Sequence, residues 1–303
     1  MKDAASAHPF LFMDAFLQNL SGGLLIGGVY ALIGVGLSLI FGVMRVINFA
    51  HGDFVVVGMY AAILINRQLG FDPFASLVIV LPLGFLLGVG LDRLVLSRLA
   101  DAPPDSSLLA TLGLALIIQN ILLLTFGAEP QTLNVPYATA TLNLGGVTLS
   151  LIQLVAGGII LLIIIALYLF LTRTEAGRAV RATAQNRLGA ELVGINTLNI
   201  RSLVFGVGMV LAITAGVTLI PQQSVTPSLT GPIFTLKAFV VTVLGGLGNI
   251  WGAIGGGLLL GIVEVLGASY LSNSYRDAYG LIAFLLVLLF RPEGLFGRSV
   301  KRV

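Results

Sequence analysis

The chain has 303 residues, of which 57% are hydrophobic and only 10% are charged, and its formal net charge is +3. An ordinary soluble domain carries about 25% charged residues. This composition therefore excludes a water-soluble globular protein and indicates that lipid is the main solvent. The chain also has no cysteine, which excludes disulfides, thiolate metal sites and cysteine nucleophiles.

Long apolar segments follow one another along the chain. A helix needs about 20 apolar residues to cross a hydrocarbon core of ~30 Å, and its backbone amides must bond within the segment. The segments that meet or approach this length are 16–44, 52–66, 74–91, 106–126, 151–171, 202–221, 233–248, 250–269 and 278–290. We predict an all-α polytopic membrane protein, a helical bundle of about eight to nine transmembrane segments with broken or re-entrant helices. Residues 1–303 would form a single domain.

Basic residues are unevenly divided between the two ends of these segments. With nine crossings and an outside N-terminus, 12 of the 16 Lys and Arg residues fall on one side. Because cytoplasmic loops carry the excess of Lys and Arg, we expect the loop 173–201 and the C-terminal tail in the cytoplasm. One extra or missing span before Asp92 would change only the side of the membrane that is assigned to the N-terminus and to Arg67.

A polar segment interrupts the apolar pattern near the start of the chain. Asn48, His51, Gly52 and Asp53 lie where one apolar run ends and the next begins. Asn48 and His51, three residues apart, would share one helix face, and polar groups at membrane depth tend to face a cavity or a partner. The alternative is a short wet turn, or a polar cap that satisfies a helix end. The two interpretations stay open at this point.

Glycines spaced four residues apart occur near both ends of the chain. Gly23 with Gly27, and Gly257 with Gly261, follow this spacing. Small residues four apart lie on one helix face and let two backbones approach closely, which promotes helix association in lipid. We interpret most of these glycines as sites of helix packing.

The run 245–249 combines three glycines with an asparagine. Gly246, Gly248 and Asn249 fall within it. Such dense glycine predicts unwound backbone between two half-helices, which is tolerated at membrane depth only where protein or a water-filled cavity surrounds it. We regard these residues as candidates for the surroundings of a pathway.

Two charged residues lie inside the late apolar segments. Lys237 and Glu264 would form a buried pair or belong to a translocation path, and the alternative is snorkelling to the interface. We favour snorkelling for Lys237 and an interior position for Glu264. Gln119 and Asn120 are expected to form hydrogen bonds between helices.

The loop 173–201 is rich in arginine. Thr174 is placed to cap a helix that begins at Glu175 and has an acidic first turn. Val180, Ala184 and Leu188 would then form one apolar stripe, with Arg178, Arg181 and Gln185 beside it. Such a helix would bind anionic headgroups or a groove of a partner protein. We favour the groove, because the helix is short and alanine is a weak lipid anchor.

Four sets of residues form a recognisable pattern: Gly36–Asp53, Gly177–Ala182 with Gly194–Ile195, Gly245–Asn249 with Gly252–Ala253, and Arg291–Gly297. This pattern resembles the LivH-type permease subunits of branched-chain amino acid ABC transporters. These segments extend over nearly the whole chain in the family's order. The resemblance implies an inner-membrane permease of an ATP-driven importer, with no catalytic residues, no cofactor and no metal.

The same resemblance implies several partners. They are a homologous LivM-like permease, two cytoplasmic ATPases of the LivG and LivF type, a periplasmic substrate-binding protein and the lipid bilayer, with no nucleic acid. The implied ATPase-coupling residues are Glu175, Gly177, Arg178, Arg181, Asn186, Arg187 and Gly194. The pathway candidates are Asn48, His51, Gly52, Asp53, Gly246, Gly248, Asn249 and Glu264.

Other functions stay open from the sequence. Relatives with these motifs carry urea or short amides, so the substrate of this chain could belong to that class. A self-sufficient channel or ion-coupled carrier is the alternative from a different class. Such a carrier needs coupling charges in its spans, and the late spans of this chain offer only Lys237 and Glu264. The chain has no Gly-x-x-x-x-Gly-Lys-Ser/Thr loop, so any ATP hydrolysis requires another subunit.

Overall fold

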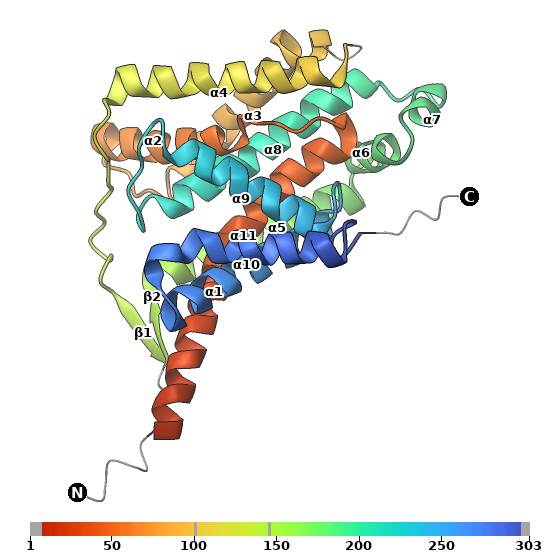
Figure 1. Ribbon diagram of the computed structural model, residues 1–303. Helices are drawn as coiled ribbons and strands as arrows, with labels where there is room; N and C mark the ends of the chain where they lie inside the picture. The colour runs from red at the N-terminus through yellow and green to blue at the C-terminus, as the bar shows by residue number, and fades with distance from the viewer. Residues whose placement is uncertain (1–7, 100–101, 145–146, 298–303) are drawn as a thin grey trace, which may run out of the picture.

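The computed structural model describes residues 8–99, 102–144 and 147–297, and long helices dominate it (Figure 1). Nine of the described helices form the bundle: α1 (His8–Met44), α2 (His51–Leu69), α3 (Leu77–Leu94), α4 (Pro104–Phe126), α5 (Leu151–Arg173), α8 (Thr197–Leu219), α9 (Thr230–Gly245), α10 (Ile250–Tyr270) and α11 (Arg276–Phe290). Each coincides with one of the nine apolar segments. The two outer ends of the chain, 1–7 and 298–303, lie outside the described residues.

Seven helices among the described residues are long and apolar enough to cross a membrane. The other two bundle helices are α2, which begins with polar residues, and α9, which has only 16 residues. The multi-pass helical bundle is therefore confirmed, and its two irregular members coincide with the segments that carry the unusual motifs.

Short elements lie at the two ends of the bundle. The helices α6 (Glu175–Gln185) and α7 (Arg187–Leu192) lie at the same end as the last turn of α11. At the opposite end are the connections from α2 to α3 and from α8 to α9. Two 3₁₀ turns, η1 (Leu96–Leu99) and η2 (Asn273–Tyr275), complete the helical elements of the described residues.

A small antiparallel hairpin, which no pattern in the sequence indicates, precedes α5. Its strands are β1 (Thr141–Leu144) and β2 (Val147–Ser150), with Leu142 opposite Leu149. Gln18 on α1 fixes the hairpin, because its side chain accepts from the Thr148 amide (2.7 Å) and donates to the Thr148 carbonyl (2.5 Å). Strands of four residues are too short to show a clear alternation in sequence.

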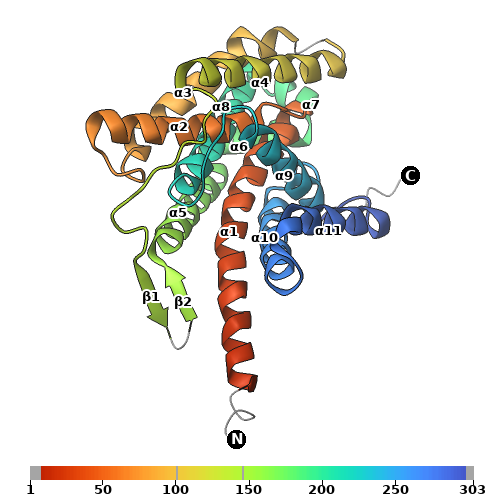
Figure 2. The ribbon, with the colours of Figure 1, turned by 60° about the vertical axis from the view of Figure 1, so that its left-hand side comes forward.

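The helix contact between α1 and α10 is built on glycine (Figure 2). A Cβ atom on Gly261 would lie 2.4 Å from the Gly27 Cα, and one on Gly257 would lie 2.3 Å from the Ala31 nitrogen. A Cβ on Gly23 would meet the Ile262 Cα at 2.9 Å. The prediction that these glycines serve helix packing is confirmed, and the two spaced sets pack against each other.

The helices differ in how far the chain itself encloses them. In α8, 83% of the apolar window is buried, whereas in α3, α4 and α5 only 22% is buried. The core therefore lies around α8, α1 and α2, and the outer helices present apolar surface to lipid or to another subunit.

Candidate functional site

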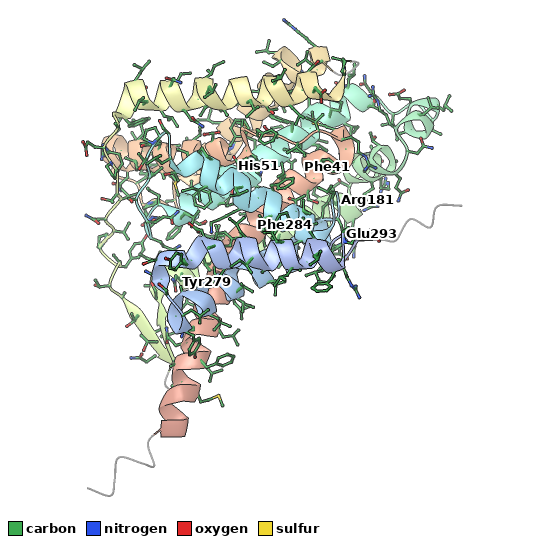
Figure 3. All side chains as sticks on the ribbon, viewed as in Figure 1. Phe41, His51, Arg181, Tyr279, Phe284 and Glu293 are labelled. Atoms are coloured by element: carbon green, nitrogen blue, oxygen red, sulfur yellow. The ribbon has the colours of Figure 1, made fainter. Side chains whose placement is uncertain are left out.

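The chain leaves helical geometry between α1 and α2. Arg45 takes a φ of 56°, a left-handed value that is uncommon for a residue other than glycine. The backbone then runs back into the bundle, and α2 begins at His51, in the middle of the molecule (Figure 3). Asn48 lies before this helix and its Oδ1 accepts from the Ala50 amide at 3.1 Å. The shared helix face predicted for Asn48 and His51 is therefore wrong, and Asn48 acts as a polar cap of the turn.

His51, the first residue of α2, is completely buried and contacts α1. Its Nε2 donates to the Ile33 carbonyl at 3.0 Å, because a carbonyl only accepts. A Cβ on Gly36 would approach the His51 Cε1 to 3.0 Å, so the glycine makes room for the ring. The other ring nitrogen, Nδ1, has no hydrogen-bond partner within the described part of the chain, and neither has the Asn48 Nδ2.

Three helices meet around Gly52 and Asp53. The Asp53 Oδ1 accepts from the Gln119 Nε2 of α4 at 2.9 Å. The Gly52 amide donates to the Thr235 hydroxyl of α9 at 2.9 Å, and this hydroxyl donates to the Phe49 carbonyl at 3.1 Å. These bonds join α2 to α4 and α9 through polar groups, which the apolar surroundings strengthen.

Gln119 and Asn120 have different roles although they are neighbours. The interhelical hydrogen bond predicted for Gln119 is confirmed by its contact with Asp53. Asn120 instead donates to the Leu116 carbonyl of its own helix at 2.8 Å, so the same prediction is wrong for it. Adjacent residues on a helix point about 100° apart, and only one of the two faces α2.

A cavity of about 660 Å³ lies beside these polar groups. Its polar lining residues are Asp53, Gln119 and Thr235. The rest of the lining is apolar and consists of Leu37, Ile47, Phe49, Leu112, Ala115, Leu116, Pro232, Leu236 and Phe239. Thr235 was not singled out from the sequence, because a lone threonine in an apolar helix has no distinguishing pattern.

The predicted unwound segment 245–249 is confirmed, but it lies away from Asp53. Gly246 and Gly248 have φ values of 91° and 80°, which favour glycine. Asn249 caps α10 by accepting from the Gly252 amide at 3.1 Å, and its Nδ2 donates to the Phe296 carbonyl at 2.9 Å. This turn lies at the end of the bundle that carries α6, where a cavity of about 250 Å³ is lined by Arg181 together with Gly248 and Asn249.

The C-terminal segment packs onto this turn. The Leu295 amide donates to the Leu244 carbonyl at 2.8 Å, and a Cβ on Gly246 would lie 3.3 Å from the Glu293 carbonyl. Residues of 292–297 and of the turn line an open cavity of about 830 Å³. Glu293 and Arg181 are labelled at this end in Figure 3.

Glu264 lies in an ionic cluster at the other end of α10. The Lys237 Nζ lies 2.5 Å from the Glu264 Oε1 and 2.8 Å from the Asp277 Oδ1. The Tyr30 hydroxyl donates to the Glu264 Oε2 at 2.8 Å, and the Arg276 Nε lies 3.8 Å from the same oxygen. Snorkelling of Lys237 is thus wrong, because its side chain is only 10% exposed and pairs with the buried Glu264 of α10. The predicted interior position of Glu264 is correct.

The helix α6 is fixed to the end of α5. Thr174 accepts from the Gly177 amide at 2.9 Å, as predicted for its N-cap. Gly177 touches the end of α5, since a Cβ there would lie 2.6 Å from the Leu171 Cα. Arg181 donates to the Leu171 carbonyl, whereas Arg178 is exposed and lies 3.5 Å from the Glu175 carboxylate. The two arginines therefore have different surroundings.

The predicted apolar stripe is interrupted. Val180 is buried, but Leu188 is 68% exposed, because the helix ends at Gln185 and Asn186 caps the separate helix α7. Asn186 accepts from the Gly189 amide at 3.0 Å. Leu188 therefore lies on another helix from Val180 and extends no stripe.

The short helix α7 is connected to α8 through Glu191. Its carboxylate accepts from the Thr197 hydroxyl at 2.7 Å and from the Arg187 Nε at 3.0 Å. These hydrogen bonds, the one from Thr197 first, hold the pKa of Glu191 below its ordinary value. Gly194, with a φ of 85°, forms the turn that leads into α8.

The comparisons with known proteins agree over most of the chain. Residues 19–290 match the family model described as "Branched-chain amino acid transport system / permease component". The chain is 34% identical to the high-affinity branched-chain amino acid transport system permease protein BraD of Pseudomonas aeruginosa, and 33% identical to the permease protein LivH of Escherichia coli K12. Each alignment covers 95% of this chain and 98% of the relative.

More distant similarities extend the comparison. The autoinducer 2 import system permease protein LsrC of Yersinia enterocolitica is 30% identical over 72% of this chain and 74% of its own. Among solved structures, a chain of PsaBC from Streptococcus pneumoniae in complex with Fab aligns with a TM-score of 0.51. It is 14% identical, covers 94% of this chain and 96% of its own length, and supports the fold alone.

Proposed function

The chain belongs to the family of permease components of branched-chain amino acid transport systems, and we propose that it forms one half of the pathway of an ATP-driven importer. It is a multi-pass membrane transport component and not an enzyme. The second half of the pathway would be a homologous, LivM-like permease. Two ATPases of the LivG and LivF type would supply ATP hydrolysis, and a periplasmic binding protein would supply the substrate.

The observation that carries the proposal is the construction of α6 and α7. They lie outside the bundle at one end, and they are fixed by the Thr174 cap and by the contact between Gly177 and Leu171. Their outer surface carries exposed charged side chains, among them Glu175 and Arg178. A rigidly attached, charged helix pair is suited to docking into a groove of another protein. The chain has no P-loop motif of its own, so that protein would be the ATPase.

The orientation follows from the charge distribution. The loop 173–201 contributes five arginines to the end that carries α6 and α7. Because an excess of Lys and Arg marks cytoplasmic loops, we assign this end and the C-terminus to the cytoplasm of a bacterial cell, with the bundle in the inner membrane. The opposite end, with the hairpin and Arg67, would face the periplasm.

The substrate pathway is assigned to the segment Asn48–Asp53. This segment starts α2 in the middle of the bundle, and it has two buried polar atoms without partners, the Asn48 Nδ2 and the His51 Nδ1, within the described residues. A buried unpaired polar group costs about 1–3 kcal/mol. Water or substrate that reaches the segment in another state of the transport cycle would offset this cost.

The other pathway candidates receive separate roles. Gly246, Gly248 and Asn249 lie at the α6 end, and we propose that they border the cytoplasmic exit. Glu264 is held by Lys237 and Tyr30, so we assign it to the stability of the helix bundle. The same pairing removes Lys237 and Glu264 as charges to which a coupling ion could bind.

Branched-chain amino acids are the substrates that the relatives BraD and LivH support by their names. Urea or a short amide is the alternative within the same class. The test is reconstitution in liposomes with the second permease, both ATPases, the binding protein and ATP. We expect leucine uptake that stops with a non-hydrolysable ATP analogue. Saturable leucine flux through the isolated chain would contradict the subunit assignment, and ATP-driven uptake of urea alone would contradict only the substrate.

A further inference from the structure

We propose that Asp53 and Gln119 recognise the ammonium group of an apolar amino acid, whose side chain lies in the adjoining cavity. This inference rests on the proposed function, since it names the part of the pathway that contacts the substrate. It assigns a binding role to a cavity of about 660 Å³ between α1, α2, α4 and α9. Small-molecule sites typically have volumes of about 300–1,000 Å³.

Asp53 supplies the negative charge. It is 2% exposed, yet it lines the cavity. The first turn of α9 approaches it so closely that a Cβ on Gly231 would lie 2.1 Å from the Asp53 Oδ1. The N-terminal end of a helix carries partial positive charge, which attracts a carboxylate.

The charge of Asp53 is not neutralised by another side chain. No lysine, arginine or histidine in the described ranges forms an ion pair with it. Its side-chain hydrogen-bond partner among the described residues is the neutral Gln119, which donates through Nε2. An anion at membrane depth is costly unless it is paired, so a cation is the group that complements this end of the cavity.

Gln119 completes the polar end. Its Nε2 is committed to Asp53, and a glutamine oxygen has acceptor capacity for a further donor. Thr235, the third polar residue of the lining, both accepts from Gly52 and donates to Phe49, so it holds the backbone in place. The polar end therefore presents acceptors on Asp53 and Gln119, and a substituted ammonium has three N–H donors to offer.

The rest of the cavity selects an apolar substituent. Leu112 and Leu116 of α4, together with Leu236 and Phe239 of α9, form walls without a charged group. A branched aliphatic side chain would be stabilised there at about 25 cal/mol per Å² of buried surface. A charged side chain would lose its hydration without compensation. One anionic end and apolar walls thus match an ammonium group next to a hydrocarbon side chain, and the α-carboxylate, for which the lining offers no cation, would stay hydrated at the open side of the cavity.

The test uses the absence of native cysteine. Leu116 is 60% exposed and lines the cavity, so Leu116→Cys offers a single labelling site. In the assembled transporter without binding protein, leucine should slow the reaction of this cysteine with a small maleimide. The analogue 4-methylpentanoate, which lacks the ammonium group, should give no protection. With Asp53→Asn added, we expect the half-protecting leucine concentration to rise at least about tenfold, because a hydrogen bond to a charged group is lost.

Two further variants serve as a control and as a replacement for Asp53→Asn. Asn120→Ala is the matched control, since Asn120 follows Gln119 but its side chain donates within α4 to the Leu116 carbonyl, and it should leave protection unchanged. If Asp53→Asn does not assemble, Gln119→Leu replaces it and should also lose protection. If Asp53→Asn or Gln119→Leu has the same half-protecting leucine concentration as the protein without it, the proposed site is overturned. Equal protection by leucine and 4-methylpentanoate would overturn it as well.

Leucine uptake in liposomes that also contain the binding protein and ATP separates the two proposals. Normal leucine uptake with unaltered protection in the variants overturns only the site and leaves the transport function standing. A wild-type transporter that takes up no leucine overturns the proposed substrate and the site with it. Normal uptake in the wild type, with uptake and protection lost together in Asp53→Asn, supports both.

Discussion

Lys237 on α9 and Glu264 on α10 form a buried ion pair, with 2.5 Å between Nζ and Oε1. Their side chains are only 10% and 2% exposed. Asp277 of α11 and Tyr30 of α1 contact the same pair, so four helices meet at this cluster. Two opposite charges from neighbouring helices thus satisfy each other inside the bundle, and neither is available for an ion to bind.

Removing one member of the pair should destabilise the protein. Lys237→Met leaves Glu264 without its nearest cation, and loss of one partner of a buried pair costs about 3–5 kcal/mol. We expect a lower thermal midpoint in detergent and less folded protein in the membrane. The double variant Lys237→Met/Glu264→Gln should recover part of the loss. Asp277→Asn is the control with a smaller effect, because the Asp277 side chain is 66% exposed. Equal stability of Lys237→Met and the wild type would contradict the prediction.

The contact between α1 and α10 predicts a sharp difference between adjacent glycines. A Cβ on Gly27 would lie 2.9 Å from the Leu258 Cα, which is backbone and cannot rotate away, whereas one on Gly28 would lie 3.8 Å from a side-chain methyl of Ile160. Gly27→Ala should therefore lower the thermal midpoint, and Gly28→Ala should leave it nearly unchanged. Fluorescence-detected size-exclusion chromatography after heating would compare the two variants. Similar losses of folded protein in both would show that the close contact between α1 and α10 does not limit stability.

Gly52 tests the packing of α2 against α9. A Cβ there would lie 2.1 Å from the Gly231 carbonyl oxygen and 2.3 Å from the Thr235 nitrogen. Even Gly52→Ala should thus reduce the amount of folded protein, and Gly52→Leu should act on folding before it acts on transport. Gly113→Ala on α4 is the control, because a Cβ there meets nothing within 4 Å. Normal yield with blocked transport in Gly52→Leu would instead favour direct obstruction of the pathway.

The two arginines of α6 should differ in their effects. Arg178 is exposed and free to contact a partner, so Arg178→Glu should abolish co-purification of the ATPases and uptake, with an unchanged thermal midpoint. Arg181 donates to the Leu171 carbonyl. Arg181→Glu should therefore loosen α6 itself, seen as faster proteolysis between 174 and 186. Arg178→Lys keeps the charge and should retain part of the ATPase binding. Normal uptake in Arg178→Glu would contradict a docking role.

The link between α7 and α8 should depend on pH. The hydrogen bonds from Thr197 and Arg187 hold the pKa of Glu191 below its ordinary value. A carboxyl group with a lowered folded-state pKa contributes stability above its unfolded pKa, and this contribution disappears as pH falls through the folded value. Proteolysis of α7 by an acid-active protease should thus accelerate in this acidic range in the wild type. Glu191→Gln should show fast cleavage at every pH, and an unchanged pH profile would contradict the assignment.

Composition and periodicity were sufficient for the helical bundle. Every helix that crosses lipid needs an uninterrupted apolar run, so the nine segments were visible in the sequence. Local signals also predicted the Thr174 cap, because an N-cap depends on residues only three apart. The unwound turn at Gly246 and Gly248 was predictable for the same reason, since positive φ values favour glycine.

Long-range contacts were decided only by the tertiary structure. Nothing local shows that Lys237 lies beside Glu264 and Asp277, or that Gln119 reaches Asp53 while Asn120 does not. The partners in these three contacts lie 27, 40 and 66 positions apart in the sequence, by difference of the residue numbers. Apolar patterning places each helix in the membrane but does not fix its rotation or its neighbours, because lipid accepts any apolar face equally well. Close packing of glycine surfaces and pairing of the few polar groups determine that arrangement, and both depend on where distant helices meet.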